Sequence, residues 1–208
     1  MKVLLINGSQ HENGCTYTAL NEVASALQKQ DIETEIFQLG KDAISGCGDC
    51  GVCFKTGRCF IDDKVNELLD KADKADGFIF GSPVYFASPS GALISFMDRL
   101  FYTNITNKLF HYKPAASIVS CRRGGASSAL DQINKYFAVF NMPVVSSQLW
   151  NMIHGNTPEE VQQDLEGMQV MRTLGKNMAW LLKSIEAGKK SNLNLPEQEA
   201  PVFTNFIR

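Results

Sequence analysis

The chain of 208 residues has no long apolar run and no concentration of basic residues. No apolar stretch approaches the ~20 residues that a membrane-spanning helix needs, so we expect no contact with a membrane. The formal net charge is -2 and no basic run exceeds a pair, which argues against a nucleic-acid partner. The apolar start from Met1 to Ile6 is too short for a signal peptide. The sequence therefore predicts a soluble, cytoplasmic protein.

Three motifs of nucleotide-binding and signalling proteins are also missing. The absence of G-x-x-x-x-G-K-[ST] excludes a P-loop nucleotide site. The absence of G-x-G-x-x-G argues against a dinucleotide site of the Rossmann type. The first apolar run ends in Asn7-Gly8-Ser9 without an acidic pair, which argues against a phospho-accepting receiver domain.

Along the whole chain, short apolar runs alternate with segments whose apolar residues recur at helical spacing. Short apolar runs predict five buried strands, at residues 3–6, 34–39, 77–81, 115–120 and 143–147. Apolar residues at helical spacing predict five helices, at residues 16–30, 62–72, 88–100, 130–140 and 157–188. This alternation predicts an α/β, flavodoxin-like three-layer sandwich. Its five-stranded parallel sheet would have the order 2-1-3-4-5, with helices on both faces.

The organisation predicted from composition is one domain and a tail. Residues 1–187 would form the flavodoxin-like domain, with a cysteine-rich segment at 45–60, the cysteine loop. Residues 188–208 are polar, with prolines at 196 and 201, and would form a C-terminal tail. The apolar end of this tail, Val202 to Ile207, would pack on its own domain or on a neighbouring subunit.

The segment after the first strand, Gly8 to Thr16, is the small-residue loop. Ligands of open parallel sheets bind beyond the carboxyl ends of the strands, where this loop would lie. It contains small and hydroxyl residues and no lysine or arginine. Backbone N–H groups, the hydroxyls of Ser9 and Thr16 and the helix dipole can together hold a phosphate. Helix capping by Thr16 is the alternative, but it needs no such long loop, so we favour a phosphate site.

The segment from Ser82 to Pro89, the aromatic loop, follows the third strand. It brings two adjacent aromatic residues, Tyr85 and Phe86, to the mouth of the sheet. A flat aromatic ligand can stack on such rings. Packing or interface roles are the alternative, and the neighbouring phosphate site favours a flavin.

The segment from Ser120 to Ser127, the glycine loop, follows the fourth strand. Its glycines permit a close approach of the backbone to a ligand. Arg122 or Arg123 can meet a phosphate of a nicotinamide cofactor or the electron-rich edge of a reduced flavin. A solvated basic pair is an equally good interpretation of the two arginines.

Four of the six cysteines share the spacing C-x2-C-x2-C-x5-C, at Cys47, Cys50, Cys53 and Cys59. Three closely spaced thiolates can surround one face of a [4Fe–4S] cluster while a fourth completes the site. Structural zinc sites usually pair two C-x2-C units across a longer stretch, which this window lacks. Free or disulfide-linked thiols are the other alternative. We predict a [4Fe–4S] cluster on these four residues.

Several of these motifs together resemble one family. Gly8-Ser9, Gly14 and Thr16, with the aromatic loop and the segment from Ser90 to Arg99, resemble the NADPH-dependent FMN reductase family. Within that family the chain is most similar to the iron-sulfur flavoproteins, from Met1 to about residue 183. The resemblance implies bound FMN, hydride or single-electron exchange at the flavin, and a homodimer or homotetramer.

The resemblance also assigns cofactor-binding residues by position. They are Ser9, His11, Gly14, Cys15, Thr16, Pro83, Val84, Tyr85, Phe86, Ser120, Arg122, Gly124 and Gly125. Relatives often carry arginine at the position of His11 and asparagine at that of Cys15. No side chain stands out as a catalytic acid or base.

The predicted function is an FMN-dependent oxidoreductase. It would pass electrons from NAD(P)H or a reduced carrier to a small acceptor such as a quinone or a flavin. The alternative is an iron-sulfur flavoprotein electron carrier with a ferredoxin-type partner and no small-molecule substrate. A redox sensor that uses its cysteines is a third interpretation.

Overall fold

The computed structural model describes residues 1–206, and within them six strands form one sheet. The strands are β1 (Lys2–Asn7), β2 (Glu33–Gln38), β3 (Gly77–Tyr85), β4 (Ser88–Pro89), β5 (Ala115–Cys121) and β6 (Met152–His154). Five of them are parallel in the order β2-β1-β3-β5-β6, and β4 pairs antiparallel with the end of β3. The flavodoxin-like fold and its order of parallel strands are confirmed, with one short strand added.

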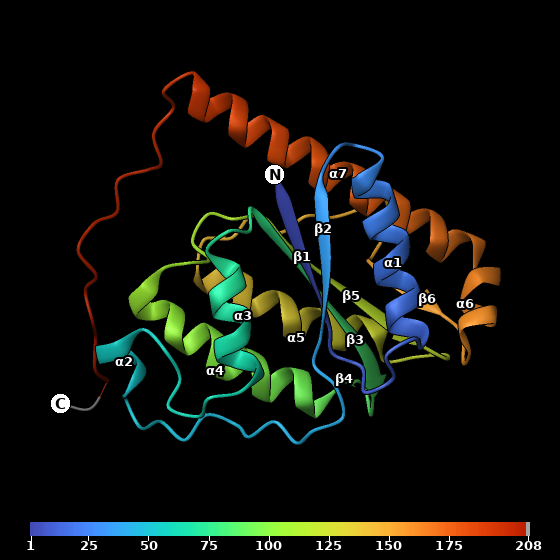
Figure 1. The fold of residues 1–208 in the computed structure, drawn as a ribbon, viewed down its shortest axis with the longest axis horizontal. Coiled ribbons are helices and arrows are strands. Elements are labelled where there is room, and N and C mark those ends of the chain that lie inside the picture. Colours follow the sequence, from blue (N-terminus) through green and yellow to red (C-terminus); the bar gives the residue numbers. More distant parts are fainter. Residues whose placement is uncertain (207–208) are drawn as a thin grey trace.

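The helices form a layer on each face of the sheet. They are α1 (Cys15–Gln28), α2 (Cys53–Thr56), α3 (Lys64–Ala72), α4 (Gly91–Asn107), α5 (Ala126–Val139), α6 (Pro158–Gln163) and α7 (Leu165–Lys190). Helices α1, α6 and α7 pack on one face, and α3, α4 and α5 pack on the other (Figure 1). None of the helices within residues 1–206 is both long enough and apolar enough to cross a bilayer.

Strand β1 shows why the early apolar run lies at the centre of the sheet. Leu4 and Ile6 pack against α3, α4 and α5, whereas Val3 and Leu5 pack against α1 and α7. All four side chains are fully buried. Because side chains alternate between the two faces of a strand, a strand covered on both faces has to be apolar throughout.

The fifth parallel strand lies later in the chain than predicted. The prediction at residues 143–147 is wrong, because only an isolated bridge joins Val144 to Ala115 within the described part of the chain. Regular pairing with β5 is made by Met152–His154 instead. Between the two contacts the chain leaves the sheet edge, and the amide of Asn151 donates to the carbonyl of Val145. Trp150, on this excursion, is 69 % exposed.

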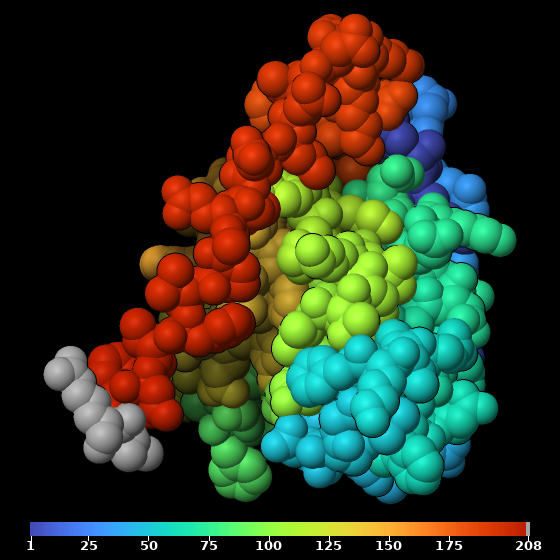
Figure 2. All heavy atoms as spheres, turned by 90° about the vertical axis from the view of Figure 1, so that its left-hand side faces the viewer, coloured from blue at the N-terminus to red at the C-terminus, as the bar shows by residue number. Residues whose placement is uncertain are grey.

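The last predicted helix is two helices, and its end differs slightly. The break is at Asp164, whose carboxylate accepts a hydrogen bond of 2.9 Å from the backbone N–H of Gly167 and so caps α7. Helix α7 ends at Lys190, two residues beyond the predicted end at Gly188. The following segment runs down one side of the molecule (Figures 1 and 2). Ile207, at the predicted apolar end of the tail, lies outside the described residues.

Candidate functional site

Three loops meet where the parallel strands end. The backbone N–H of Gly8 donates to the carbonyl of Gly81 over 2.8 Å. The hydroxyl of Ser90, which caps α4, donates to the carbonyl of Gly8 over 2.7 Å. The small-residue loop is thus held against β3 and the start of α4. Figure 1 shows the start of α1 and strand β4 at this same end of the sheet.

The small-residue loop turns sharply through its own polar groups. Asn7 Oδ1 accepts from the N–H of Ser9, and Ser9 Oγ accepts from the N–H of His11, each over 3.1 Å. Gly14 is the N-cap residue of α1, and this helix has no side-chain capping hydrogen bond. The first N–H groups of any helix have no carbonyl within that helix to donate to. Backbone donors at the start of α1 are therefore available to an anionic ligand, at the positive end of the helix dipole.

Thr16 and Ser120, two predicted binding residues, face each other. Their hydroxyl oxygens lie 2.8 Å apart, and the two residues are 1 % and 5 % exposed. This bond joins the start of α1 to the end of β5. Helix α1 is capped by Gly14, so Thr16 is not the cap. Both hydroxyls hold the small-residue loop and the glycine loop together.

The aromatic loop is a β-hairpin that projects from the sheet. Val84 and Tyr85 pair with Pro89 and Ser88. The two turn residues, Phe86 and Ala87, have φ values of +50° and +60°, as a type I′ turn requires. Phe86 is fully exposed and Tyr85 half-exposed. The hairpin therefore presents two aromatic rings at the end of the sheet where the other loops meet.

The glycine loop touches the tip of this hairpin. Gly125 has φ of +84°, and a Cβ at its position would lie 2.7 Å from the Cα of Ala87. Glycine is needed here for both reasons, since an L side chain would be strained and would overlap the hairpin. Gly124 and Arg122 are exposed beside it. The structure thus brings the predicted residues of the three loops to one end of the sheet.

A cavity of about 470 Å³ adjoins the small-residue loop and contains residues that the sequence interpretation missed. Its lining residues are His11, Glu12, Asn13, Gly14, Cys15, Lys41, Asn156, Thr157 and Pro158. Lys41 comes from the segment after β2, where a single lysine carries no pattern that would identify it. The thiol of Cys15 lies 3.8 Å from the carbonyl of Gly155, and burial raises its pKa. Cys15 is therefore a protonated thiol at neutral pH.

The four cysteines of the cysteine loop line a second, smaller space, which we call the cysteine cavity. It has a volume of about 130 Å³, and α4 contributes Arg99, Tyr102 and Thr103 to its wall. Cys53 is buried at the start of α2, and burial raises the pKa of its thiol, as do the other three cysteines. Within residues 1–206, no three side chains of His, Cys, Asp or Glu lie close enough to share one metal ion. The four cysteines line this cavity without converging on one metal-ion position.

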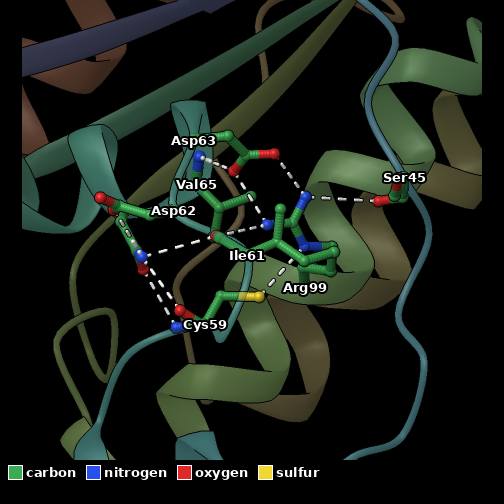
Figure 3. Close-up of polar contacts among 8 residues, drawn as sticks. Ser45, Cys59, Ile61, Asp62, Asp63, Val65 and Arg99 are labelled. Carbon is green, nitrogen blue, oxygen red and sulfur yellow. Dashed lines mark hydrogen bonds and ion pairs between the residues drawn. The ribbon is translucent and has the colours of Figure 1, made fainter.

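Arg99 lines the cysteine cavity from α4, and Figure 3 shows its side chain pointing toward Asp63, Cys59 and Ile61. Its side chain is 1 % exposed, and its guanidinium forms a two-point ion pair with Asp63 at 2.7 and 2.8 Å. Nε donates to Sγ of Cys59 over 3.2 Å. Burial alone would lower the pKa of Arg99, but Asp63 and Cys59 raise it above the ordinary value, so the group is a permanent cation. In the sequence, Arg99 stands out only as the last residue of the motif that begins at Ser90.

Comparison with known proteins agrees with this geometry. The family model of NADPH-dependent FMN reductases matches residues 1–157. The chain is 34 % identical over 192 residues to an iron-sulfur flavoprotein of Methanocaldococcus jannaschii, covering 89 % of this chain and 100 % of that protein. An iron-sulfur flavoprotein of Methanosarcina thermophila is 25 % identical over 191 residues, covering 91 % and 99 %.

A solved flavodoxin from the domain Archaea has the same fold. Its TM-score is 0.57 at 18 % identity, over 88 % of this chain and 99 % of that one. The family resemblance predicted from the motifs is confirmed by the family model and by the relatives. The chain belongs to the NADPH-dependent FMN reductase family, whose members are flavodoxin-like, NAD(P)H-dependent FMN oxidoreductases.

Proposed function

We propose that this FMN oxidoreductase has a second redox centre, a [4Fe–4S] cluster held by Cys47, Cys50, Cys53 and Cys59. It takes electrons from NAD(P)H or a reduced carrier and passes them to a small acceptor such as a quinone or a flavin. The observation that carries the proposal is that all four thiols of the spaced motif line one cavity, which a buried arginine also lines.

The chain's residues fit FMN at the three loops. The small-residue loop, with Ser9, Gly14 and the backbone donors of α1, would hold the phosphate. The hairpin at Tyr85 and Phe86 and the glycine loop would lie along the isoalloxazine ring. FMN, when bound, supplies hydride or single-electron exchange. The protein's part is to bind, orient and surround it, and no side chain of the site is assigned as an acid or base.

The cysteine cavity fits an iron-sulfur cluster better than a zinc ion. Clusters of this type are held by four cysteine thiolates around a volume, whereas zinc draws four ligands to one point. The cavity wall is mostly apolar, with the cation of Arg99 beside Cys59. The relatives named iron-sulfur flavoproteins align along most of this chain. A cluster, when bound, supplies one-electron exchange.

Helix α4 connects the two proposed centres. Ser90 at its start contacts the small-residue loop, and Arg99 reaches the cysteine cavity. Arg99 is the ninth residue after Ser90, which is ~14 Å along the helix axis. This proximity supports electron exchange between the two sites.

A second candidate function is an electron carrier without a small-molecule substrate. Cys47 and Cys50 are exposed, and the neighbouring ring of Phe60 is 74 % exposed. Such a surface suits docking of a ferredoxin-type protein. Oxidation of NADPH by the pure FMN-loaded protein separates the two candidates. Rapid turnover with a quinone or flavin supports the enzyme, whereas reduction by ferredoxin alone supports the carrier.

The cluster is tested by purification without oxygen, followed by counts of iron, sulfide and flavin. We expect four irons per chain, FMN rather than FAD, and loss of the iron but not of FMN in Cys53→Ser. Cys121→Ser is the matched control for the iron count alone, because Cys121 is also buried but lies in the glycine loop, outside the cysteine cavity. A flavin-only spectrum after reconstitution of the wild type with iron and sulfide would show that the cysteines have another role. Release of FAD would contradict the flavin assignment.

A further inference from the structure

A buried cation stands beside the cysteine cavity, and the flavin chemistry does not use it. Arg99 is the largest fully buried side chain of the described residues. Charged side chains are rarely buried, because leaving water is costly unless every polar group is paired. Its position within helix α4 therefore needs an explanation beyond packing.

All five N–H donors of Arg99 have acceptors (Figure 3). Beyond the contacts with Asp63 and Cys59, Nη2 donates to the carbonyl of Ile61 over 2.9 Å and Nη1 to that of Ser45 over 3.4 Å. Ser45 precedes the first cysteine of the motif, and Ile61 follows the last. A single side chain thus fixes both ends of the cysteine loop. Lysine could not replace it, because the planar guanidinium fork makes these bonds simultaneously.

The charge of Arg99 is already balanced by Asp63, which also accepts from the N–H of Val65 at the start of α3. The group that faces the cysteines is therefore the Nε–H donor to Cys59 Sγ rather than an uncompensated charge. Hydrogen bonds to ligating sulfurs are among the features that set the reduction potential of iron-sulfur centres. A donor stabilises the more negative, reduced state and so raises the potential.

We propose that Arg99 is the positioning residue of the cysteine cavity and, through its hydrogen bond to Cys59, raises the reduction potential of the cluster held there. This inference rests on the proposed function, since it concerns the same four cysteines. It differs from a purely structural role in one respect. A structural residue would change cluster content alone, whereas Arg99 and Asp63 should shift the potential in opposite directions.

The experiment compares Arg99→Gln, Asp63→Asn and Arg58→Gln in the full chain, reconstituted with FMN, iron and sulfide without oxygen. Arg58 is the matched control, because it adjoins Cys59 in sequence but forms an exposed ion pair with Asp70. Iron per chain is counted first. The cluster potential is then measured by titration with dithionite, which supplies the one electron per cluster, and is followed by electron spin resonance. The FMN potential is recorded in the same samples.

We expect Arg99→Gln to lower the cluster potential, by about 59 mV for a tenfold change in the oxidised-to-reduced ratio. Asp63→Asn leaves the cation uncompensated and should raise the potential, while Arg58→Gln should match the wild type. If Arg99→Gln loses its iron but keeps FMN, positioning is supported and Asp63→Asn decides the effect on potential. Shifts of the same sign, or no shift in either variant, would overturn the inference. A wild type that binds no cluster would instead overturn the proposed function.

Discussion

Several side chains of the proposed flavin site already form hydrogen bonds with neighbouring groups of the loops. The hydroxyl of Ser9 accepts from the N–H of His11, and those of Thr16 and Ser120 share a bond. Backbone donors at the start of α1 are then the main groups left for a phosphate, together with the nearby side chains of His11 and Lys41. A negative charge introduced at this point should have a large effect on binding.

His11→Glu should weaken FMN binding about tenfold or more. A carboxylate ~4 Å from a phosphate is repelled by roughly 1 kcal/mol per pair of charges in water and more near a protein surface. Titration of the apoprotein with FMN, followed by quenching of flavin fluorescence, measures the dissociation constant. His11→Gln, which has similar size and no charge, is the control and should bind nearly as well as the wild type. Equal affinities of the two variants would show that the phosphate lies elsewhere.

Arg99 and Lys41 show which site residues sequence patterns miss. Arg99 lies on a helix and forms its ion pair with Asp63, 36 residues earlier. A lone charged residue within an amphipathic helix is ordinarily solvated, so nothing local predicts that Arg99 is buried. Ser9, Gly14 and Gly125 could be predicted as loop residues because backbone turns restrict residue type locally. An ion pair between residues that are far apart in the sequence leaves no such local pattern.

At the scale of elements, the contact between the glycine loop and the hairpin depends on Gly125. Gly125→Ala should lower the free energy of unfolding by roughly 2–4 kcal/mol. Alanine would be strained in the left-handed backbone conformation of this position, and its Cβ would overlap with Ala87. Urea unfolding of the apoprotein measures this change, and FMN binding should weaken as the two loops separate.

Gly124→Ala is the matched control for that variant. A Cβ at Gly124 meets nothing within 4 Å, so the expected change is within about 0.5 kcal/mol, as for most surface substitutions. Similar losses of stability in both variants would mean that the two loops are not held together at Gly125.

The sequence predicted the central elements better than those at the edges. β1, β3 and β5 are buried on both faces, so their apolar runs are unambiguous. The prediction of the last strand is wrong, because only three residues of β6 pair with β5, after the chain has left the sheet. The hairpin was also missed, since Phe86-Ala87 lacks the Asn-Gly type of sequence that marks such turns. Ser88-Pro89 was interpreted as a helix start, which in the structure comes at Ser90.

For the whole molecule, exposed aromatic side chains suggest association between copies of the chain. Phe86 at the hairpin, Trp150 before β6 and Trp180 on α7 are each at least 69 % exposed. Large exposed apolar groups often mark interfaces. We predict a homodimer or homotetramer. Light scattering of the FMN-loaded protein at several concentrations should give two or four times the chain mass of 23.0 kDa. A mass of 23.0 kDa throughout would contradict the prediction.

The fixed geometry of helix α4 restricts where residues can be inserted or deleted. The spacing between Ser90 and Arg99 is set by residue count, because an α-helix turns ~100° and advances ~1.5 Å with each residue. One residue inserted between them would rotate the guanidinium away from Cys59 and Asp63 while leaving the contact of Ser90 with Gly8 in place. Chains that keep both sites should therefore tolerate length changes in the cysteine loop far more readily than in this stretch of helix.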